Sequence, residues 1–368
     1  MQFQKTAKLL ILNNKIIRSV MAVVVSVAAG AVFAHLGTPL PWMIGPMIVM
    51  AVLNSAGAEL LCPPGMRQAG QILIGTALGL YFTPVVSGEV LAHWGLLIAT
   101  TLFATLLALL GGLFLVRVTG TTLTTGFFAS VPGGAAEMTN LGLRHGGSPE
   151  RIAIAQAVRA VLVVLVVPVA LTVSGAHGDA LFTPVVLPVR AEGLAALLAL
   201  STLSGFLMLR CATPNPFMLG PLFLSIAVTV AGWEFSAMPS LFSNAGQLFL
   251  GCALGSRFSR PFLRSAPVFL LASTVSALLG IAVSALFGTV LALMADTAAA
   301  GSVASVPSMI LVTAPGGIAE MCITAKVLQL GVPLVTAAHV VRMVFLNACM
   351  GAISRLGRAL RQRWLRHR

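Results

Sequence analysis

Charge is the scarcest property of this chain. Only 8% of its 368 residues are Asp, Glu, Lys or Arg, whereas 58% are hydrophobic, and the mean hydropathy is +1.00. A soluble domain carries roughly 25% charged residues, because polar surface must cover a globule that faces water. The scarcity of charge therefore excludes a soluble protein and predicts a chain that folds within a lipid bilayer.

Groups that carry out chemistry are also scarce. The five cysteines are odd in number and show no Cys-x-x-Cys or metal-ligand spacing, so no disulfide framework or zinc site is expected. The six histidines are dispersed, and no pair has the His-x-x-x-His spacing of a metal site. No ATP-binding motif is present. We therefore expect no enzyme activity, no cofactor and no metal ion.

The few charged residues give a net charge of +13, and many of the basic ones lie at the two ends of the chain. These are Lys5, Lys8, Lys15, Arg18, Arg355, Arg358, Arg361, Arg363, Arg366 and Arg368. Basic residues that flank membrane spans follow the positive-inside rule and face anionic lipid. The positive charge therefore indicates a lipid bilayer as the partner and argues against nucleic acid.

Apolar runs fill most of the chain between these basic ends. They are 19–36, 41–57, 66–83, 91–116, 152–174, 192–209, 216–232, 243–259, 266–294 and 334–353. A helix rises 1.5 Å per residue, so runs of this length can cross a hydrocarbon core about 30 Å thick. The sequence predicts an all-α polytopic membrane protein with about ten transmembrane helices.

Four sequence blocks occur twice, in the same order. PWMIGPM (41–47) matches PFMLGPL (216–222), AGQILIGTALG (69–79) matches AGQLFLGCALG (245–255), VPGGAAEM (131–138) matches APGGIAEM (314–321), and AVRAVLVV (157–164) matches VVRMVFLN (340–347). Four ordered matches at offsets of 175, 176, 183 and 183 predict an internal duplication. The membrane repeats are then residues 19–175 and 192–354. They are flanked by a basic N-terminus (1–18), an external linker (176–191) and a basic tail (355–368).

Each half contains a Pro-Gly-Gly segment between its fourth and fifth apolar spans. Proline removes a backbone donor and stops a helix, and paired glycines allow backbone angles closed to other residues. Non-helical backbone at membrane depth is tolerated only where it is buried in protein or lines a wet cavity. We therefore expect a re-entrant loop or broken helix at each site, although a simple kink in a packed helix is the alternative. The candidate binding residues are Pro132, Gly133, Gly134, Pro315, Gly316 and Gly317.

The number of crossings decides how the halves are oriented. If each Pro-Gly-Gly segment enters and returns, each half has five spans and the halves are inverted. Arg190 and Lys326 then lie outside, and nearly all other basic residues lie in the cytoplasm. If the segments cross, six arginines move outside. The positive-inside rule favours two inverted five-span halves in the cytoplasmic membrane, with both termini cytoplasmic.

Glu137 and Glu320 follow the two Pro-Gly-Gly segments. An ionisable residue at membrane depth costs about 2.5–3.5 kcal/mol on insertion scales and is usually functional. The two glutamates are therefore candidates for binding a coupling cation, a proton or an amine. The alternative is a carboxylate at a wet helix end, neutralised by the start of its own helix.

Arg159 and Arg342 each lie 22 residues after a glutamate, inside the following span. A buried guanidinium must be paired or face a cavity. One possibility is a structural Glu–Arg bridge. The other is that an arginine holds a substrate carboxylate through its two-pronged fork.

Four further polar residues are second-tier candidates. Gln71 and Gln247 occupy the twin glycine-rich spans, whose glycines more often serve helix packing than binding. His339 replaces Gln156 of the first half and is either a proton carrier or a hydrogen-bonded structural residue. Asn140 follows the first break.

The paired PWMIGPM/PFMLGPL and VPGGAAEM/APGGIAEM blocks resemble the AbrB-type integral membrane protein family, which carries the AbrB duplication. The resemblance runs from about residue 19 to 354. Members are often labelled ammonia monooxygenase or regulator. An ammonia monooxygenase needs clustered metal ligands, but the histidines here are dispersed. A DNA-binding regulator needs a soluble DNA-reading module, and the chain has no room for one. In architecture the chain is also similar to the sodium-coupled citrate and glutamate symporters, which have two inverted five-span halves with Gly-Gly re-entrant loops.

These features predict an ion-coupled secondary transporter of a small polar or charged solute, carboxylate or amino-acid-like, with a proton or Na⁺ as the coupling ion. Inverted repeats and broken helices that meet near the midplane are the common design of that class. The glycine backbones would bind an anionic group, and a homodimer is possible. The alternative is a membrane-embedded sensor that acts on gene expression through a partner. A membrane enzyme is a third, disfavoured reading.

Overall fold

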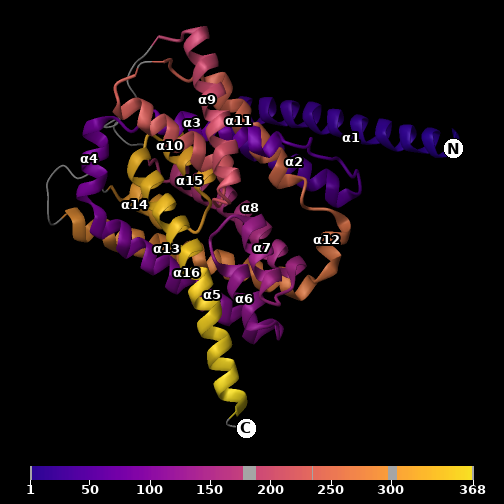
Figure 1. Ribbon diagram of the computed structural model, residues 1–368, viewed down its shortest axis with the longest axis vertical. Coiled ribbons are helices and arrows are strands. Elements are labelled where there is room, and N and C mark those ends of the chain that lie inside the picture. The colour runs from indigo at the N-terminus through magenta and orange to yellow at the C-terminus, as the bar shows by residue number, and fades with distance from the viewer. Residues whose placement is uncertain (1, 177–187, 234, 297–304, 367–368) are drawn as a thin grey trace.

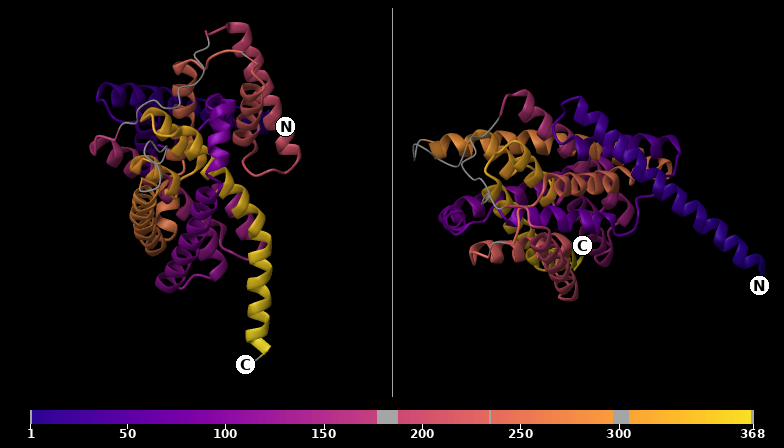
Figure 2. Two further views of the ribbon diagram at one scale, coloured as in Figure 1. Left: turned by 90° about the vertical axis from the view of Figure 1, so that its left-hand side faces the viewer. Right: turned by 90° about the horizontal axis from the view of Figure 1, so that it is seen from above.

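The computed structural model describes residues 2–176, 188–233, 235–296 and 305–366, and all regular elements in these ranges are α-helices. The helices pack into one body, from which the N-terminal part of α1 and the C-terminal part of α16 project (Figures 1 and 2). Most of the expected external linker lies outside the described residues, because 177–187 are not among them.

The described helices form two series with the same order of long and short members. The first is α1 (Gln2–His35), α2 (Pro41–Ala56), α3 (Met66–Gly79), α4 (Pro84–Ala92), α5 (Trp94–Thr119), α6 (Leu123–Ser130), α7 (Ala135–Arg144) and α8 (Pro149–Val173). The second is α9 (Ala191–Arg210), α10 (Pro216–Val230), α11 (Ser240–Gly255), α12 (Arg260–Ser265), α13 (Pro267–Asp296), α14 (Val306–Thr313), α15 (Ile318–Val327) and α16 (Val332–Arg366). In both series an eight-residue helix and a ten-residue helix precede the last member.

Six helical segments in the described residues are long and apolar enough to cross a membrane. They are Lys15–His35, Trp94–Thr119, Pro149–Val173, Ala191–Arg210, Pro267–Met294 and Val332–Cys349. A seventh arises if α3 and α4, which meet at a bend of 91°, count as one span. Leucines on α5 such as Leu102, Leu106 and Leu113 are about half exposed, as suits helices that face lipid tails. The chain is therefore a polytopic α-helical membrane protein.

Four of the ten predicted spans form shorter helices than expected. α2, α3, α10 and α11 have 16, 14, 15 and 16 residues. The runs look continuous in hydropathy, but turns cut them short. Gly57 ends α2 with a positive φ of 99°, and Gly232 follows the end of α10 with a φ of 74°, both in the left-handed region that glycine enters freely.

The two series contact each other in an exchanged pattern. α2 packs on α11, and correspondingly α10 packs on α3. The same exchange relates the α1–α11 and α9–α3 contacts, and the α8–α13 and α16–α5 contacts. The equivalent helices α3 and α11 also contact each other, as do α5 and α13. Such reciprocal contacts are what a two-fold relation between two similar units produces.

Glycines allow the closest of these exchanged contacts. A Cβ at Gly75 of α3 would lie 2.6 Å from the carbonyl oxygen of Met218 in α10. A Cβ at Gly251 of α11 would collide with the carbonyl oxygen of Met43 in α2, which is the equivalent contact. Small residues spaced along a helix let backbones approach closely within a membrane. The repeated AGQ…ALG blocks therefore contribute helix packing in both halves.

Replacing Gly251 with alanine should destabilise the protein by about 1–3 kcal/mol, because the added methyl group meets backbone that cannot move aside cheaply. The matched control is Gly280→Ala on α13, where an added Cβ meets nothing within 4 Å. That control should be neutral or stabilising by up to about 1 kcal/mol, since alanine favours the helix. Unfolding of the purified protein in detergent micelles measures both. Equal stability of the two variants would contradict this account of the α2–α11 contact.

Candidate functional site

The Pro-Gly-Gly segments are breaks between two short helices in each half. The first separates α6 from α7, and the second separates α14 from α15. Gly134 and Gly317 are the N-cap residues of α7 and α15, and both have extended backbone. Glu137 and Glu320 lie in the first turns of the restarted helices, as the sequence predicts.

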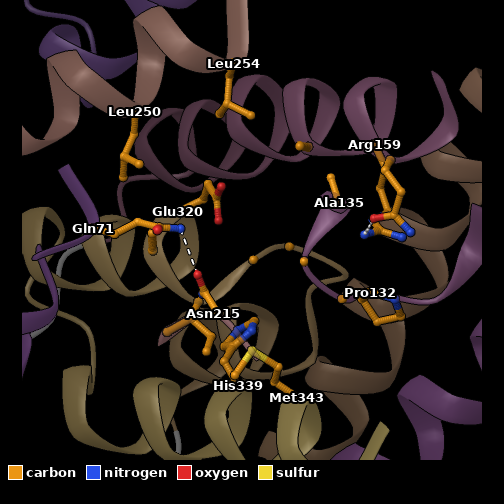
Figure 3. A pocket seen from close by; sticks show the side chains of 18 of the residues that line it. Gln71, Pro132, Ala135, Arg159, Asn215, Leu250, Leu254, Glu320, His339 and Met343 are labelled. Atoms are coloured by element: carbon orange, nitrogen blue, oxygen red, sulfur yellow. Dashed lines mark hydrogen bonds between the residues drawn. The ribbon is translucent and has the colours of Figure 1, made fainter. Parts of the chain in front are cut away.

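Both breaks line one pocket with a volume of about 80 Å³ (Figure 3). The predicted site residues around it are Gln71, Pro132, Gly133, Gly134, Arg159, Pro315, Gly316, Gly317, Glu320, His339 and Arg342. Figure 3 shows the carboxylate of Glu320 pointing into the pocket, with Gln71 and Arg159 on opposite sides. Segments 183 positions apart in the sequence thus face the same small space.

Three predicted residues do not line this pocket. Glu137 lies just behind it, and its Oε1 accepts a hydrogen bond of 3.2 Å from the backbone N–H of Asn215, which is a lining residue. Asn140 is exposed on α7. Gln247 is buried on α11, whereas its counterpart Gln71 lines the pocket and donates to Oδ1 of Asn215 at 2.8 Å.

The two glutamates fold back over the glycines that start their own helices. A Cβ added at Gly134 would collide with Oε2 of Glu137, and one added at Gly317 would collide with Oε2 of Glu320. The free N–H groups and the dipole at a helix start favour negative charge there. Oε2 of Glu137 is buried and has no hydrogen-bond partner in the described part of the chain.

The arginines bind the backbone of the breaks. Nη1 of Arg159 donates to the carbonyl oxygens of Ser130 and Val131 at 3.0 and 2.9 Å. Arg342 donates in the same way, to Ala314 at 2.8 Å and to Gly316 at 2.6 Å. These carbonyls lose their helical partners where the chain unwinds, so a buried guanidinium supplies the missing donors.

This arrangement differs from both sequence-based readings of the arginines. Within the described ranges, neither arginine forms an ion pair within 4.0 Å of Glu137 or Glu320. A Glu–Arg bridge is therefore not formed there. The Nη atoms of both arginines donate to backbone carbonyls, so their donors are largely unavailable to a substrate carboxylate. Nε of Arg159 is buried and has no hydrogen-bond partner among the described residues.

His339 and Gln156 take equivalent places beside these arginines. Nη2 of Arg159 donates to Oε1 of Gln156 at 2.7 Å, and Nη2 of Arg342 lies 2.6 Å from Nδ1 of His339. The other side of His339 faces a carbonyl, with Nε2 at 2.9 Å from the oxygen of Leu311. Nδ1 must accept from the guanidinium and Nε2 must donate, which assigns a neutral imidazole. Both ring nitrogens of His339 are therefore occupied by hydrogen bonds in this arrangement.

Several residues that line the pocket were not among the sequence-based candidates, and the most polar of them include Arg67, Asn215 and Arg257. Arg67 is the second residue of α3, and Arg257 follows the end of α11. Asn215 precedes α10 with a φ of 51°, a left-handed conformation that asparagine tolerates better than most residues. The available signal was position: each of the three borders one of the duplicated blocks.

Comparisons with known proteins identify the family of this chain. The model of the family described as "Transition state regulatory protein AbrB" matches residues 42–358. The alignment with "Uncharacterized protein YhjN" of Bacillus subtilis (strain 168) is 375 positions long and 26% identical. It covers 94% of this chain and 94% of the relative. "Putative regulator AbrB" of Escherichia coli (strain K12) is 24% identical over 342 residues, covering 91% of this chain and 95% of the relative. No solved structure matches significantly. Because the family model spans most of the chain, including both Pro-Gly-Gly breaks, the protein belongs to the AbrB family.

Proposed function

We propose that this protein is an ion-coupled secondary transporter of a small polar or charged solute, carboxylate or amino-acid-like, and that the pocket between the breaks is its solute site. One observation carries the proposal: both Pro-Gly-Gly breaks line a single pocket together with charged side chains. Unwound backbone inside a membrane protein is tolerated where it lines a cavity. Transporters use such interrupted helices to bind solutes and ions near the midplane.

The proposed architecture is a pair of inverted five-span halves with about ten crossings. In it, α6–α7 and α14–α15 enter the bilayer from opposite faces, and α2, α3, α10 and α11 contribute spans despite their short helices. The exchanged contacts between the two helix series support a two-fold relation. The proposal puts both termini in the cytoplasm, as the positive-inside rule favours, and the protein in the cytoplasmic membrane.

Glu137 and Glu320 are the proposed coupling residues, for a proton or Na⁺. Each carboxylate lies at the start of a half-helix next to an unwound segment. Carboxylate and backbone oxygens are ligands that hard cations prefer. A gradient of such an ion would supply the driving force.

Uptake into proteoliposomes tests the proposal. Carboxylates and amino acids are first screened for stabilisation of the purified protein, because a ligand that binds only the folded state raises the melting temperature. Each ligand found is then offered, radiolabelled, to proteoliposomes with and without an imposed proton or Na⁺ gradient. Gradient-driven accumulation that an ionophore abolishes is the expected result. Ligands that bind but never accumulate in the liposomes would refute transport.

The alternative function, a regulator, is favoured by two names, that of the Escherichia coli relative and the description of the family. In that reading the pocket binds a ligand and the basic tail, 355–368, contacts a partner or anionic lipid. The same uptake assay on a chain truncated after Ser354 separates the two. Uptake should survive the truncation if transport is the function, whereas a sensor that signals through its tail should lose its effect on gene expression.

A further inference from the structure

We infer that the pocket selects a small organic anion of the carboxylate class, and that Arg67 and Arg257 are the residues that hold its negative charge. This assignment refines the solute site proposed above and rests on it. It also moves the anion-binding role away from Arg159 and Arg342, to which the sequence pattern pointed.

The charge of the pocket lining is the first argument. Four arginines line it, Arg67, Arg159, Arg257 and Arg342, against the single carboxylate of Glu320. Glu137 lies behind the lining and attracts Arg257, so it offsets one further positive charge. The lining stays positive after both carboxylates are counted. Charge in a membrane-embedded pocket is costly unless it is compensated, so an anion is the solute that this lining stabilises most.

Hydrogen bonding separates the four arginines into two pairs. Arg159 and Arg342 direct their Nη atoms at backbone carbonyls of the breaks and at Gln156 and His339. Arg67 and Arg257 are half-buried, and neither guanidinium has a hydrogen bond or ion pair to any residue that the structure describes. A guanidinium carries five N–H donors in a planar fork that matches a carboxylate. The donors of Arg67 and Arg257 are therefore the ones available to a ligand.

The positions of Arg67 and Arg257 favour a ligand that binds between them. α3 packs against α11, which brings Arg67 at the start of one helix to the same pocket as Arg257 beyond the end of the other. The two guanidiniums repel each other. A carboxylate that contacts both would replace this repulsion with two attractive interactions, at close range and with limited screening. Gln71 and Asn215, which bond each other at 2.8 Å, line the same pocket and add polar groups.

The test measures the melting temperature of the purified full-length protein in lipid-free detergent at constant ionic strength. Succinate, citrate, glutamate and phosphate are the anionic probes, and choline is the cationic one. At least one of the three carboxylates should raise the melting temperature of the wild type, and choline should not. In Arg67→Gln and Arg257→Gln the midpoint concentration of that shift should rise about tenfold or more, because a charge-assisted bond is lost. Arg264→Gln, at an exposed arginine that does not line the pocket, is the matched control and should behave as wild type.

Several outcomes would overturn the assignment. They are stabilisation by choline or phosphate alone, no stabilisation by any of the carboxylates, or equal stabilisation of the wild type and both pocket variants. Phosphatidylglycerol is added in a separate arm, because a lipid headgroup shares the anionic chemistry. A shift that requires this lipid would assign the arginines to lipid binding instead. If a glutamine variant does not fold, Arg257→Lys takes its place, since it keeps the charge and removes only the fork. Binding is measured without transport, so failure of uptake in proteoliposomes leaves this result standing and refutes only the transport function.

Discussion

Ion-coupled uptake should fall about 10- to 100-fold in Glu320→Gln, because an amide is neutral and loses the charge-assisted bonds of a carboxylate to the coupling ion. Glu320 lines the pocket itself, so the effect should be larger there than in Glu137→Gln. Glu137 does not line the pocket, and its Oε1 accepts a hydrogen bond from the backbone N–H of Asn215, which does. Uptake is measured in proteoliposomes with a fixed ion gradient, and unfolding of the same preparations shows whether the fold is retained.

Alanine at the N-cap glycines provides an independent check on the same carboxylates. The Cβ of Gly317→Ala would occupy the position of Oε2 of Glu320, and Gly134→Ala does the same to Glu137. Each substitution leaves the glutamate in the chain but displaces its carboxylate from the helix start. Gly280→Ala, which meets no neighbour, controls for the substitution itself. If the glutamine and N-cap variants all transport like wild type, the coupling role of the glutamates is wrong.

The parts of the fold that follow from local chemistry could be predicted from the sequence. The helix breaks at Pro132 and Pro315 are of this kind, because a missing backbone donor and two flexible glycines interrupt a helix whatever surrounds them. The restart with a glutamate in the first turn follows from the same short segment. Helices occupy the predicted apolar runs because hydropathy over a long window depends little on tertiary contacts.

Features that depend on tertiary packing could not be predicted. The partners of Arg159 and Arg342 are carbonyls 26 to 29 positions earlier in the chain, and a one-letter sequence does not mark which carbonyls lack donors. The ends of α2 and α10 depend on turns: Leu40 and Asn215, the residues before these helices, share a left-handed conformation at φ 52° and 51°. The predicted runs 41–57 and 216–232 start at the same residues as these helices, but hydropathy does not show the turn before each of them.

Arg342→Leu should unfold the second broken helix and lower the stability of the whole protein by about 3 kcal/mol or more. The side chain is buried, with 4% exposed, and its three hydrogen bonds run to Ala314, Gly316 and Nδ1 of His339. Leucine is large enough to fill much of the space but leaves three buried acceptors without donors, at about 1–3 kcal/mol each. Arg159→Leu should have a smaller effect, because part of the Arg159 side chain is exposed, whereas Arg342 is buried. Unfolding in detergent micelles compares the two.

The first half of the chain supplies the matched control for this prediction. Gln156 accepts from Arg159 and donates to the carbonyl of Phe128, just as His339 bonds Arg342 and the carbonyl of Leu311. His339→Gln should therefore keep both bonds and stay within about 1 kcal/mol of wild type, since an amide has one acceptor and two donors. His339→Leu should lose both. Arg342→Lys should fall between wild type and Arg342→Leu, because one ammonium cannot reproduce the geometry of the planar fork. If His339→Gln is as unstable as His339→Leu, the two halves do not use His339 and Gln156 in the same way.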